Sequence, residues 1–525
     1  MILALTSQRS RLKGALLIAL VAGRIFTHSV FADESADRIN ALEKLIEAQN
    51  QKIDALTEKV KLLEQREQGR TNNVSSRQLP TIVIDTNGVP ITPAATGGDQ
   101  PEPGLSGEAT KQLPQIIVGS DGFLMRSADT NFVLRLRGLV QLDSRTFFDD
   151  NTYSEGNDSF VLRRARPIIE GTVFKDFDFQ LAPDFGGSSV QIFDAWINYR
   201  YRPELQLRAG KFKGPVGFEN LQSDATLPFN ERSLVSALVP VRNVGVQLWG
   251  DVAGGVMSYA AGVFNGAGDS RNPSTTDFAD HKEVAGKIAL QPFKQSSFSG
   301  LRGLGFGVGG SYSQVSSNAQ ALPNTTGGAV PGYTTSALQQ FFAYNPRIGP
   351  VVGDGAHWRI SPYIYYLRGP FGLLGEHAIS HQGVLNSATL LKAELEHTAW
   401  QVSAQWVLTG EPASFSGIVP LHPFNLTSGG WGAWQLVARY GQLDIDAAAF
   451  HGFSNPAVSA SSATSWSVGI NWWLNKNVRV LMSYAHTGFD GGGGFNPVDP
   501  ITLLPPAIVT QQDENVFFTR FQLAF

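Results

Sequence analysis

The sequence predicts an all-β protein, a transmembrane antiparallel β-barrel of about 16 strands preceded by a short N-terminal coiled coil. The first observation is residues 177–185, where apolar residues such as Phe177 alternate without a break with polar residues such as Asp178. The second is composition, because charged residues make up only 16%, aromatic residues reach 10% and 55 glycines suit many turns. A soluble sandwich of two sheets would alternate in the same way, so this stretch alone leaves both architectures open.

Composition also limits the chemistry. The mean hydropathy of -0.08 does not exclude a membrane protein, because barrel strands alternate and never build a long apolar run. The absence of cysteine excludes disulfides, thiolate metal sites, cysteine nucleophiles and an N-terminal lipid anchor on cysteine. With 41 basic and 45 acidic residues the net charge is -4, so any anion preference must come from where individual arginines point.

Residues 1–32 have the pattern of a secretory signal peptide. Arg9, Arg11 and Lys13 precede an apolar stretch at residues 14–23, and the small Ala32 suits a cleavage site. The alternative is a membrane anchor. We favour cleavage because the apolar stretch is about half of the ~20 residues that a spanning helix needs.

Residues 33–68 are predicted to form a periplasmic coiled coil, because apolar residues fall into heptads. The heptad residues are Ile39, Leu42, Ile46, Ile53, Leu56, Val60 and Leu63. A lone amphipathic helix is the alternative. β-Branched residues at the first heptad position favour a two-stranded coil, although a barrel of this kind is expected to be trimeric. Residues 69–122 are rich in glycine, proline, serine and threonine, which indicates a flexible linker in which residues 82–84 and 116–118 could pair locally.

The barrel is predicted to occupy residues 123–525. Its first strand begins at Asn131, and its last strand ends on Phe525 with Arg520 on the polar face. Long and short connections alternate, as expected if the long ones are extracellular, except that residues 409–430 are long where a short turn is due. The remaining strands are expected near residues 160–174, 177–185, 190–202, 205–213, 243–251, 256–264, 281–293, 302–314, 356–368, 371–382, 395–408, 431–445, 463–474 and 477–489.

Enzyme motifs are mostly absent, and a barrel hydrolase would need a serine–histidine pair that the sequence does not reveal. The sequence has no G-x-S-x-G elbow, no H-E-x-x-H pair and no P-loop, and its histidines lack ligand spacing. Gly303, Gly305, Gly307 and Gly309 alternate with larger residues, which predicts a strand whose inner face is small enough to leave room for a loop or a channel. We expect no catalytic residue, no cofactor, no metal site and no nucleic-acid partner.

Several ordered segments resemble the phosphate-selective porin O/P family of Gram-negative outer membranes. The longest are RRARPIIEGTVFKDFDFQLAPDFGG at residues 163–187 and LQLRAGKFKGPVGFENLQS at residues 205–223. Shorter ones lie at residues 241–248, 369–376, 406–411 and 430–434, so the likeness covers roughly residues 120–525. The resemblance implies a trimeric barrel in the outer membrane, surrounded by its lipid. A terminal Phe525 also resembles the signal read by the barrel assembly machinery.

The first candidate anion-binding residues are basic residues whose position in the predicted strands places them on the face toward the lumen. Arginine suits phosphate because its planar fork bonds two oxygens and stays charged. The basic residues with inward register are Arg135, Arg137, Arg164, Arg166, Arg208 and Arg202. The alternative is that a polar lumen simply balances these residues with acids such as Asp143 and Glu170.

The resemblance implies a more specific site, a constriction formed by a loop folded into the barrel. Matching positions on the strands are Arg137, Arg163, Arg164 and Asp194. The loop follows Lys211 and Lys213, could be lined by Ser223, Thr226 and Arg232, and returns to the wall at Arg242. Arg163 and Arg164 are neighbours and should point to opposite faces unless a β-bulge intervenes.

The expected function is passive, anion-selective diffusion of small inorganic anions, with phosphate or polyphosphate as the favoured solute. Two alternatives remain open. One is a general or sugar-passing porin of the same fold. The other is a mainly structural role in which the coiled coil tethers the envelope.

Overall fold

The computed structural model describes residue 47 and residues 113–148, 156–187, 189–273, 281–316, 329–344, 349–495 and 508–525. The expected signal peptide at residues 1–32 lies outside the described residues. The same holds for the heptad positions between residues 39 and 63, although Glu47 is helical. Among the described residues, no helix combines the length and the apolar character needed to cross a membrane.

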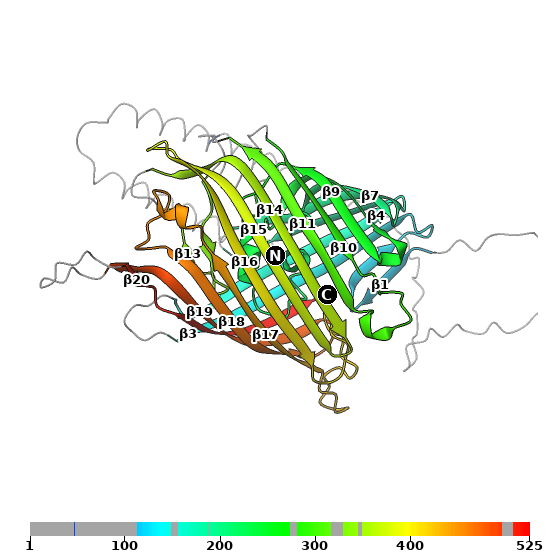
Figure 1. Ribbon diagram of the computed structural model, residues 1–525. Helices are drawn as coiled ribbons and strands as arrows, with labels where there is room; N and C mark the ends of the chain where they lie inside the picture. Colours follow the sequence, from blue (N-terminus) through cyan, green and yellow to red (C-terminus); the bar gives the residue numbers. More distant parts are fainter. Residues whose placement is uncertain are drawn as a thin grey trace, which may run out of the picture. The chain divides into compact units, whose positions relative to one another are not determined.

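Within the described chain, sixteen antiparallel strands form a closed barrel, as the sequence predicted. The barrel closes where β21 pairs with β3, with Arg520 opposite Asp143. Figure 1 shows the strands running obliquely around the barrel. The first eight strands are β3 (Phe132–Phe147), β4 (Ser159–Val173), β5 (Phe177–Asp184), β6 (Gln191–Arg202), β7 (Leu205–Phe212), β8 (Asn243–Val252), β9 (Met257–Phe264) and β10 (Glu283–Leu290). The other eight are β11 (Leu304–Val315), β14 (Val351–Arg368), β15 (Phe371–Asn386), β16 (Lys392–Val407), β17 (Ala433–Asp444), β18 (Ala460–Trp473), β19 (Val478–Phe495) and β21 (Glu514–Ala524).

Smaller elements lie at the ends and inside the barrel. The short strands are β1 (Gln115–Gly119), β2 (Gly122–Arg126), β12 (Tyr333–Thr334), β13 (Gln340–Phe342) and β20 (Ile508–Thr510). The short helices are α3 (Phe218–Leu221), η1 (Leu234–Leu238), η2 (Ala253–Gly255), η3 (Ser299–Leu301) and η4 (Ala447–Phe450).

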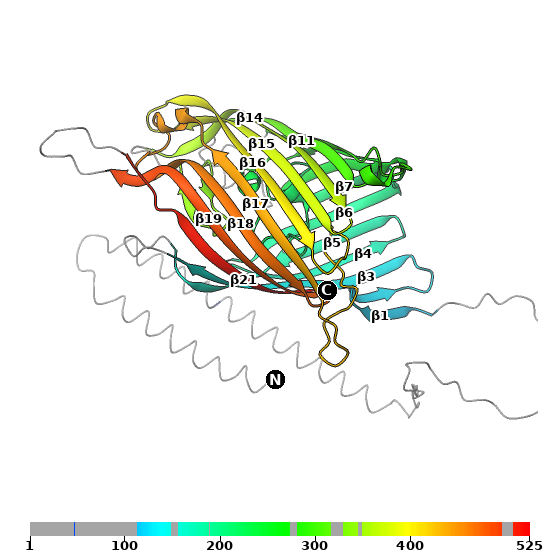
Figure 2. The ribbon, with the colours of Figure 1, turned by 60° about the horizontal axis from the view of Figure 1, so that its bottom comes forward.

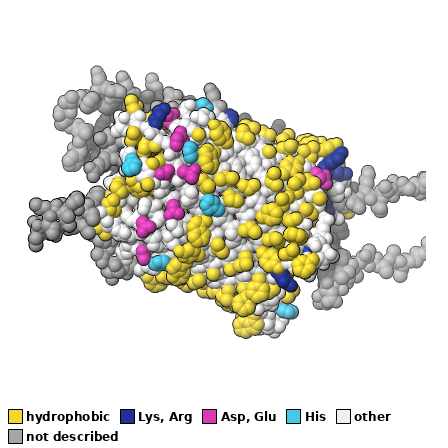
Figure 3. Space-filling view, in the orientation of Figure 1, with side chains coloured by type: hydrophobic (Ala, Val, Ile, Leu, Met, Phe, Trp, Pro, Cys, Tyr) yellow, Lys and Arg dark blue, Asp and Glu magenta, His cyan; other side chains and the backbone are white. Residues whose placement is uncertain are grey.

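The two faces of the wall follow the period-two alternation. On β21, Phe521 is 58% exposed, whereas its neighbour Arg520 is completely buried. On β5, Phe177 is 44% exposed and Asp184 is 4% exposed. In Figure 3, hydrophobic side chains cover much of the outer face over the strands. The wall therefore presents apolar side chains outward and polar ones to the lumen, as a barrel in lipid requires.

The connection at residues 408–432 is the one that broke the alternation of long and short turns. Part of it folds back toward the lumen, because Ile418 is 2% exposed and the amide of Ala413 donates to the carbonyl oxygen of Gly369 at 2.8 Å. The Thr226 hydroxyl donates to the carbonyl oxygen of Phe415 at 2.9 Å. This connection is long because it packs against the interior.

The hairpin of β1 and β2 completes the seam of the barrel. Strand β3 pairs with β21 from Phe147 to Leu139, and the same edge then pairs with β2 from Leu136 to Val133. Asn477 ties the two together, because its amide donates to the carbonyl oxygens of Ser120 and Ala524 at 2.5 and 2.6 Å. β2 lies between β1 and β3 in the sheet, and Figure 2 shows β1 at the end of the barrel where the C-terminus lies. The expected linker at residues 69–122 thus ends earlier, because β1 already belongs to this hairpin.

The segment between β7 and β8, residues 213–242, lies inside the barrel and is called here the inner loop. It carries α3 and η1, and η1 packs against β15, β16 and β17 on the opposite side of the wall. Leu238 and Val235 are 0% and 1% exposed, within a core that wall residues such as Ala378 complete. The inner loop therefore crosses the lumen, as the family resemblance implied.

Candidate functional site

The wall makes room for the inner loop where β11 carries glycine on its inner face. A Cβ atom at Gly309 would lie 2.5 Å from the carbonyl oxygen of Pro215, so no larger residue fits without displacing the loop. Beside it the ring of Phe218 stacks on Tyr365, with 5.2 Å between ring centroids. The predicted small inner face of this strand is confirmed. The inner loop occupies the space at Gly309, whereas the rings of Tyr365 and Tyr363 of β14 occupy it at Gly305 and Gly307.

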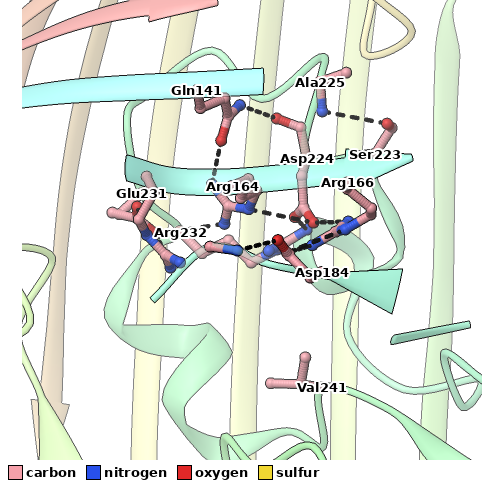
Figure 4. A network of polar contacts seen from close by, with 12 residues as sticks. Gln141, Arg164, Arg166, Asp184, Ser223, Asp224, Ala225, Glu231, Arg232 and Val241 are labelled. Atoms are coloured by element: carbon pink, nitrogen blue, oxygen red, sulfur yellow. Dashed lines mark hydrogen bonds and ion pairs between the residues drawn. The ribbon is translucent and has the colours of Figure 1, made fainter. Parts of the chain in front are cut away.

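Asp224 anchors the near side of the inner loop to β4 (Figure 4). Its Oδ2 atom lies 2.8 Å from Arg166 and 3.5 Å from Arg164, and its Oδ1 atom lies 2.6 Å from Arg232. Arg166 is also paired with Asp184 of β5 at 2.6 Å. One loop carboxylate is thus shared by three guanidinium groups, two on the wall and one on the loop itself.

Glu231 anchors the loop a second time, and a β-bulge makes this possible. The register of β3 with β4 pairs Gln141 with Arg164 and then Leu142 with Leu162, which leaves Arg163 as the extra residue. Arg163 donates to both oxygens of Glu231 at 2.6 and 3.0 Å, and Arg164 lies 3.6 Å from the same carboxylate. The bulge therefore lets consecutive arginines reach one acid.

The same carboxylate joins the inner loop to the last strand. Arg520 of β21 donates to Glu231 at 2.9 Å and to both oxygens of Asp143 at 2.6 and 2.7 Å. Neither Arg520 nor Asp143 has exposed side-chain area. Buried charges of this kind require partners, and removal of one partner leaves the others uncompensated.

The guanidinium groups set the charge state of the two loop carboxylates. Burial alone would raise the pKa of Asp224, but Arg164 and Arg232 hold that pKa well below its ordinary value. Burial likewise opposes ionisation of Glu231, whereas Arg163 and Arg164 keep its pKa far below its usual range. Both groups are ionised at neutral pH, so the ion pairs that hold the loop persist over a broad pH range.

The far side of the inner loop is held by different contacts. Glu376 of β15 accepts hydrogen bonds from the amides of Phe218 and Glu219 at 2.6 and 3.1 Å. The Glu219 carboxylate lies 3.3 Å from Arg439 of β17. The inner loop is therefore fixed to opposite sides of the barrel wall.

Next to the loop, toward the end with short turns, a cavity of about 450 Å³ opens between the inner loop and strands β3 to β10. We call it the lower cavity. Its basic lining residues are Arg137, Arg166, Arg208, Lys213, Arg242 and Lys287. Its acidic lining residues are Glu170, Asp194, Asp224 and Asp251. Basic side chains therefore outnumber acidic ones six to four.

The residues predicted from the sequence fall into three groups. Those that line the lower cavity are Arg137, Arg166, Asp194, Arg208, Lys213, Ser223 and Arg242. Those that hold the inner loop without lining this cavity are Arg163, Arg164 and Arg232. Arg135 and Lys211 belong to neither group.

The last two residues have partners of their own. Arg135 lies 3.2 Å from Glu170, and the Lys211 ammonium donates to the carbonyl oxygen of Pro273 at 2.6 Å. Arg242 is paired with Asp194 at 3.0 Å on the cavity wall. Arg202 does not line the cavity and lies with its guanidinium 5.0 Å from the ring centroid of Tyr201.

Residues 134–491 match the model of a family described as phosphate-selective porin O and P. The chain belongs to this family. Family membership and the closed barrel identify it as an outer-membrane channel, and the predicted resemblance is confirmed. No curated protein matches the sequence.

Solved structures to which the chain is similar include other outer-membrane proteins. The channel DcaP of Acinetobacter baumannii is 11% identical with a TM-score of 0.46, and the match covers 75% of this chain and 98% of that chain. OmpT of Vibrio cholerae in its trimer form is 10% identical with a TM-score of 0.42, covering 75% and 99%. OmpF of Salmonella typhi in complex with daunomycin is 14% identical with a TM-score of 0.41, covering 75% and 98%.

Sequence reasoning named Glu170 and Asp194, which pair with arginines of the wall, but missed the two inner-loop acids that partner the arginines of β4. Asp224 and Glu231 lie 58 and 68 residues from Arg166 and Arg163 in the sequence, so no local pattern connects them. Arg439 and Arg479 were also missed, although both occupy inward positions of alternating strands. In the described part of the chain, no group of three or more histidine or acidic residues could hold a metal ion.

Proposed function

We propose that the protein is a porin through which small anions diffuse passively across the outer membrane, with phosphate or polyphosphate as the favoured solute. The observation that supports this proposal is the excess of basic over acidic side chains in the lower cavity. Local potential in a narrow channel with low-dielectric walls governs ion passage more than net charge does. A cationic lumen is therefore compatible with a chain whose net charge is -4.

The mechanism follows from how the arginines are held. Arg163 and Arg164 keep the inner loop in place and so set the width of the passage. Arg137 and Lys213, which line the lower cavity, would replace part of an anion's hydration shell. Several weak sites in series allow an ion to enter and still leave. In this proposal no side chain forms a covalent bond with the solute.

The second candidate function is a general or sugar-passing porin of the same fold. It is favoured by the pairing of most predicted arginines with acids, since Arg166 and Arg242 each have a carboxylate within 3.0 Å. Paired arginines attract anions less than free ones do. Ion selectivity distinguishes the two functions, because a general porin would discriminate little between potassium and chloride.

Assembly and envelope roles remain proposals. We expect homotrimers and delivery by the barrel assembly machinery through the strand that ends at Phe525. A tethering role would require the coiled coil predicted at residues 33–68. Deletion of residues 39–63 should then weaken the envelope and leave single-channel conductance unaltered, whereas a change in conductance would contradict a purely structural role.

The proposed function is tested by replacing Arg137 and Arg164 with alanine and measuring ion selectivity in planar bilayers. The double variant should lose a clear part of the anion preference, because one positive charge lies in the cavity and the other holds the loop beside it. Arg302→Ala removes a positive charge from an exposed turn and serves as the matched control. Unchanged anion preference in the double variant would contradict the assignment.

A further inference from the structure

Of the six basic residues that line the lower cavity, three have no acidic partner among the described residues, and one of these, Lys213, donates to the carbonyl oxygen of Gln222. Within the described parts of the chain, no hydrogen bond or ion pair joins Arg208 of β7 or Lys287 of β10 to another side chain, although both line the cavity. By contrast Arg137, Arg166 and Arg242 each have a carboxylate within 3.3 Å. Arg208 and Lys287 are therefore the cavity cations with most capacity to bind a solute.

Arg208 is held by aromatic rings in place of acids. Its guanidinium carbon lies 4.3 Å from the ring centroid of Trp196 and 4.8 Å from that of Trp249. Trp249 is itself fixed, because its indole N–H donates to Asn198 at 2.8 Å. Of the Arg208 nitrogens only Nε is enclosed without a partner, so the two Nη donors open on the cavity. The indoles orient the guanidinium, and its edge remains available for a carboxylate.

Lys287 lies on the same wall as Trp249, with the small residue Ala260 between them on the neighbouring strand. The cross-strand register places Trp249 opposite Ala260, and Ala260 opposite Lys287. Because neighbouring strands lie about 4.8 Å apart, Lys287 is about 10 Å along the wall from Trp249. Phe212 and Leu221 add further apolar surface to the cavity lining. The cavity thus combines a cationic edge with an apolar wall.

This combination distinguishes between kinds of anion. Inorganic phosphate gains nothing from indole, phenyl or methyl surface, whereas an organic anion buries its apolar body there. A volume of about 450 Å³ is within the range of ~300–1,000 Å³ that is typical of sites for small organic ligands.

We propose that the lower cavity binds organic carboxylates with an apolar body, whose carboxylate accepts from Arg208 and whose body lies against Trp249 and Ala260. Lys287 attracts the anion from the far side. The inference rests on the proposed function, since it names a class of solute for the same channel. No covalent step is involved.

The test uses the full-length protein in planar bilayers and compares benzoate with acetate as blockers of the chloride current. The two anions share a carboxylate and a charge, and differ in the apolar body. Benzoate should reduce the current at a concentration about tenfold lower than acetate, because the ring removes apolar surface from water. Equal block by the two anions would overturn the proposal, and this comparison needs no variant.

Substitution then tests the assignment of residues. Arg208→Gln should raise the benzoate concentration needed for half block by about tenfold, since a charge-assisted, two-pronged contact is lost. Arg302→Gln, which changes an exposed turn, should leave that concentration unchanged. A wild-type response of Arg208→Gln to benzoate would overturn the role of Arg208.

The same recordings separate this inference from the proposed function. Chloride preference without selective benzoate block contradicts the organic-anion site alone. Potassium preference with benzoate block that depends on Arg208 contradicts the anion-selective function and supports the site.

Discussion

Glu231→Gln is the substitution that most clearly separates anchoring from solute binding. Glu231 joins Arg163 of the bulge at 2.6 Å to Arg520 of the last strand at 2.9 Å. Glutamine keeps the size and much of the hydrogen bonding of the side chain and removes one negative charge from the lumen. We therefore expect the variant to fold and to prefer anions more strongly than the wild type.

The size of the effect follows from Coulomb's law. For an assumed distance of about 7 Å between a passing ion and the carboxylate, the interaction is about 0.6 kcal/mol in water and about 2.4 kcal/mol at an effective dielectric constant of 20. Salt at 0.1 M, with a Debye length of ~10 Å, halves both energies. Loss of the charge favours chloride and disfavours potassium by equal amounts, so their permeability ratio should rise at least about threefold, since ~1.4 kcal/mol corresponds to tenfold.

The assay is the zero-current potential across a planar bilayer under a KCl gradient, with heat-modifiable electrophoretic mobility as the check of folding. Glu394→Gln removes a carboxylate that is 54% exposed on β16, and it should leave the ratio unchanged. The reasoning is refuted if Glu231→Gln folds and its permeability ratio equals that of the wild type or moves toward potassium.

Three further outcomes are expected. Gly309→Ala should displace the inner loop, destabilise the barrel by about 1–3 kcal/mol and change single-channel conductance, because the new Cβ would lie 2.5 Å from the carbonyl oxygen of Pro215. Gly375→Ala is the control for both unfolding temperature and conductance, because its Cβ would have no neighbour closer than 3.5 Å. In a Glu376→Gln variant, which removes the buried carboxyl that accepts from the loop amides of Phe218 and Glu219, conductance should stay constant as pH falls from neutral to about 5 and change only in stronger acid. The reason is that a carboxylate with a lowered pKa, such as Asp224 or Glu231, stabilises the loop above its ordinary pKa and loses that effect as pH falls through the lowered one; a transition near pH 6 in this variant would contradict this. Asn477→Ala should cost about 1–3 kcal/mol in barrel unfolding, because two hydrogen bonds to the seam are lost. An unchanged unfolding temperature would exclude a stabilising role for these two bonds.

Much of the barrel could be predicted from the sequence because period-two alternation is a local property. The lipid-facing position of Phe521 and the inward position of Arg520 both follow from neighbouring residues. The glycines of β11 predicted space for a loop, and Gly309 provides it. Strand ends were less accurate, since β19 extends to Phe495, beyond the expected residue 489. Its added residues pair with β20, which no period-two pattern indicated.

The candidate site was harder to predict because it depends on contacts between distant residues. Alternation gave the inward face of Arg164, but the bulge that also brings Arg163 to Glu231 is a shift of one residue in register. The resemblance placed arginines in the constriction without identifying Asp224 and Glu231 as their partners. Whether an inward arginine is free or paired is decided by the folded loop, and that cannot be read from the strand alone.

The zero-current potential of the wild-type protein under a KCl gradient, repeated with added phosphate, tests the central claim most directly. The account predicts a potential directed to chloride and a current that falls as phosphate is added, because basic side chains outnumber acidic ones in the lower cavity. A potential near zero or directed to potassium would contradict it and show that acidic side chains govern the lumen.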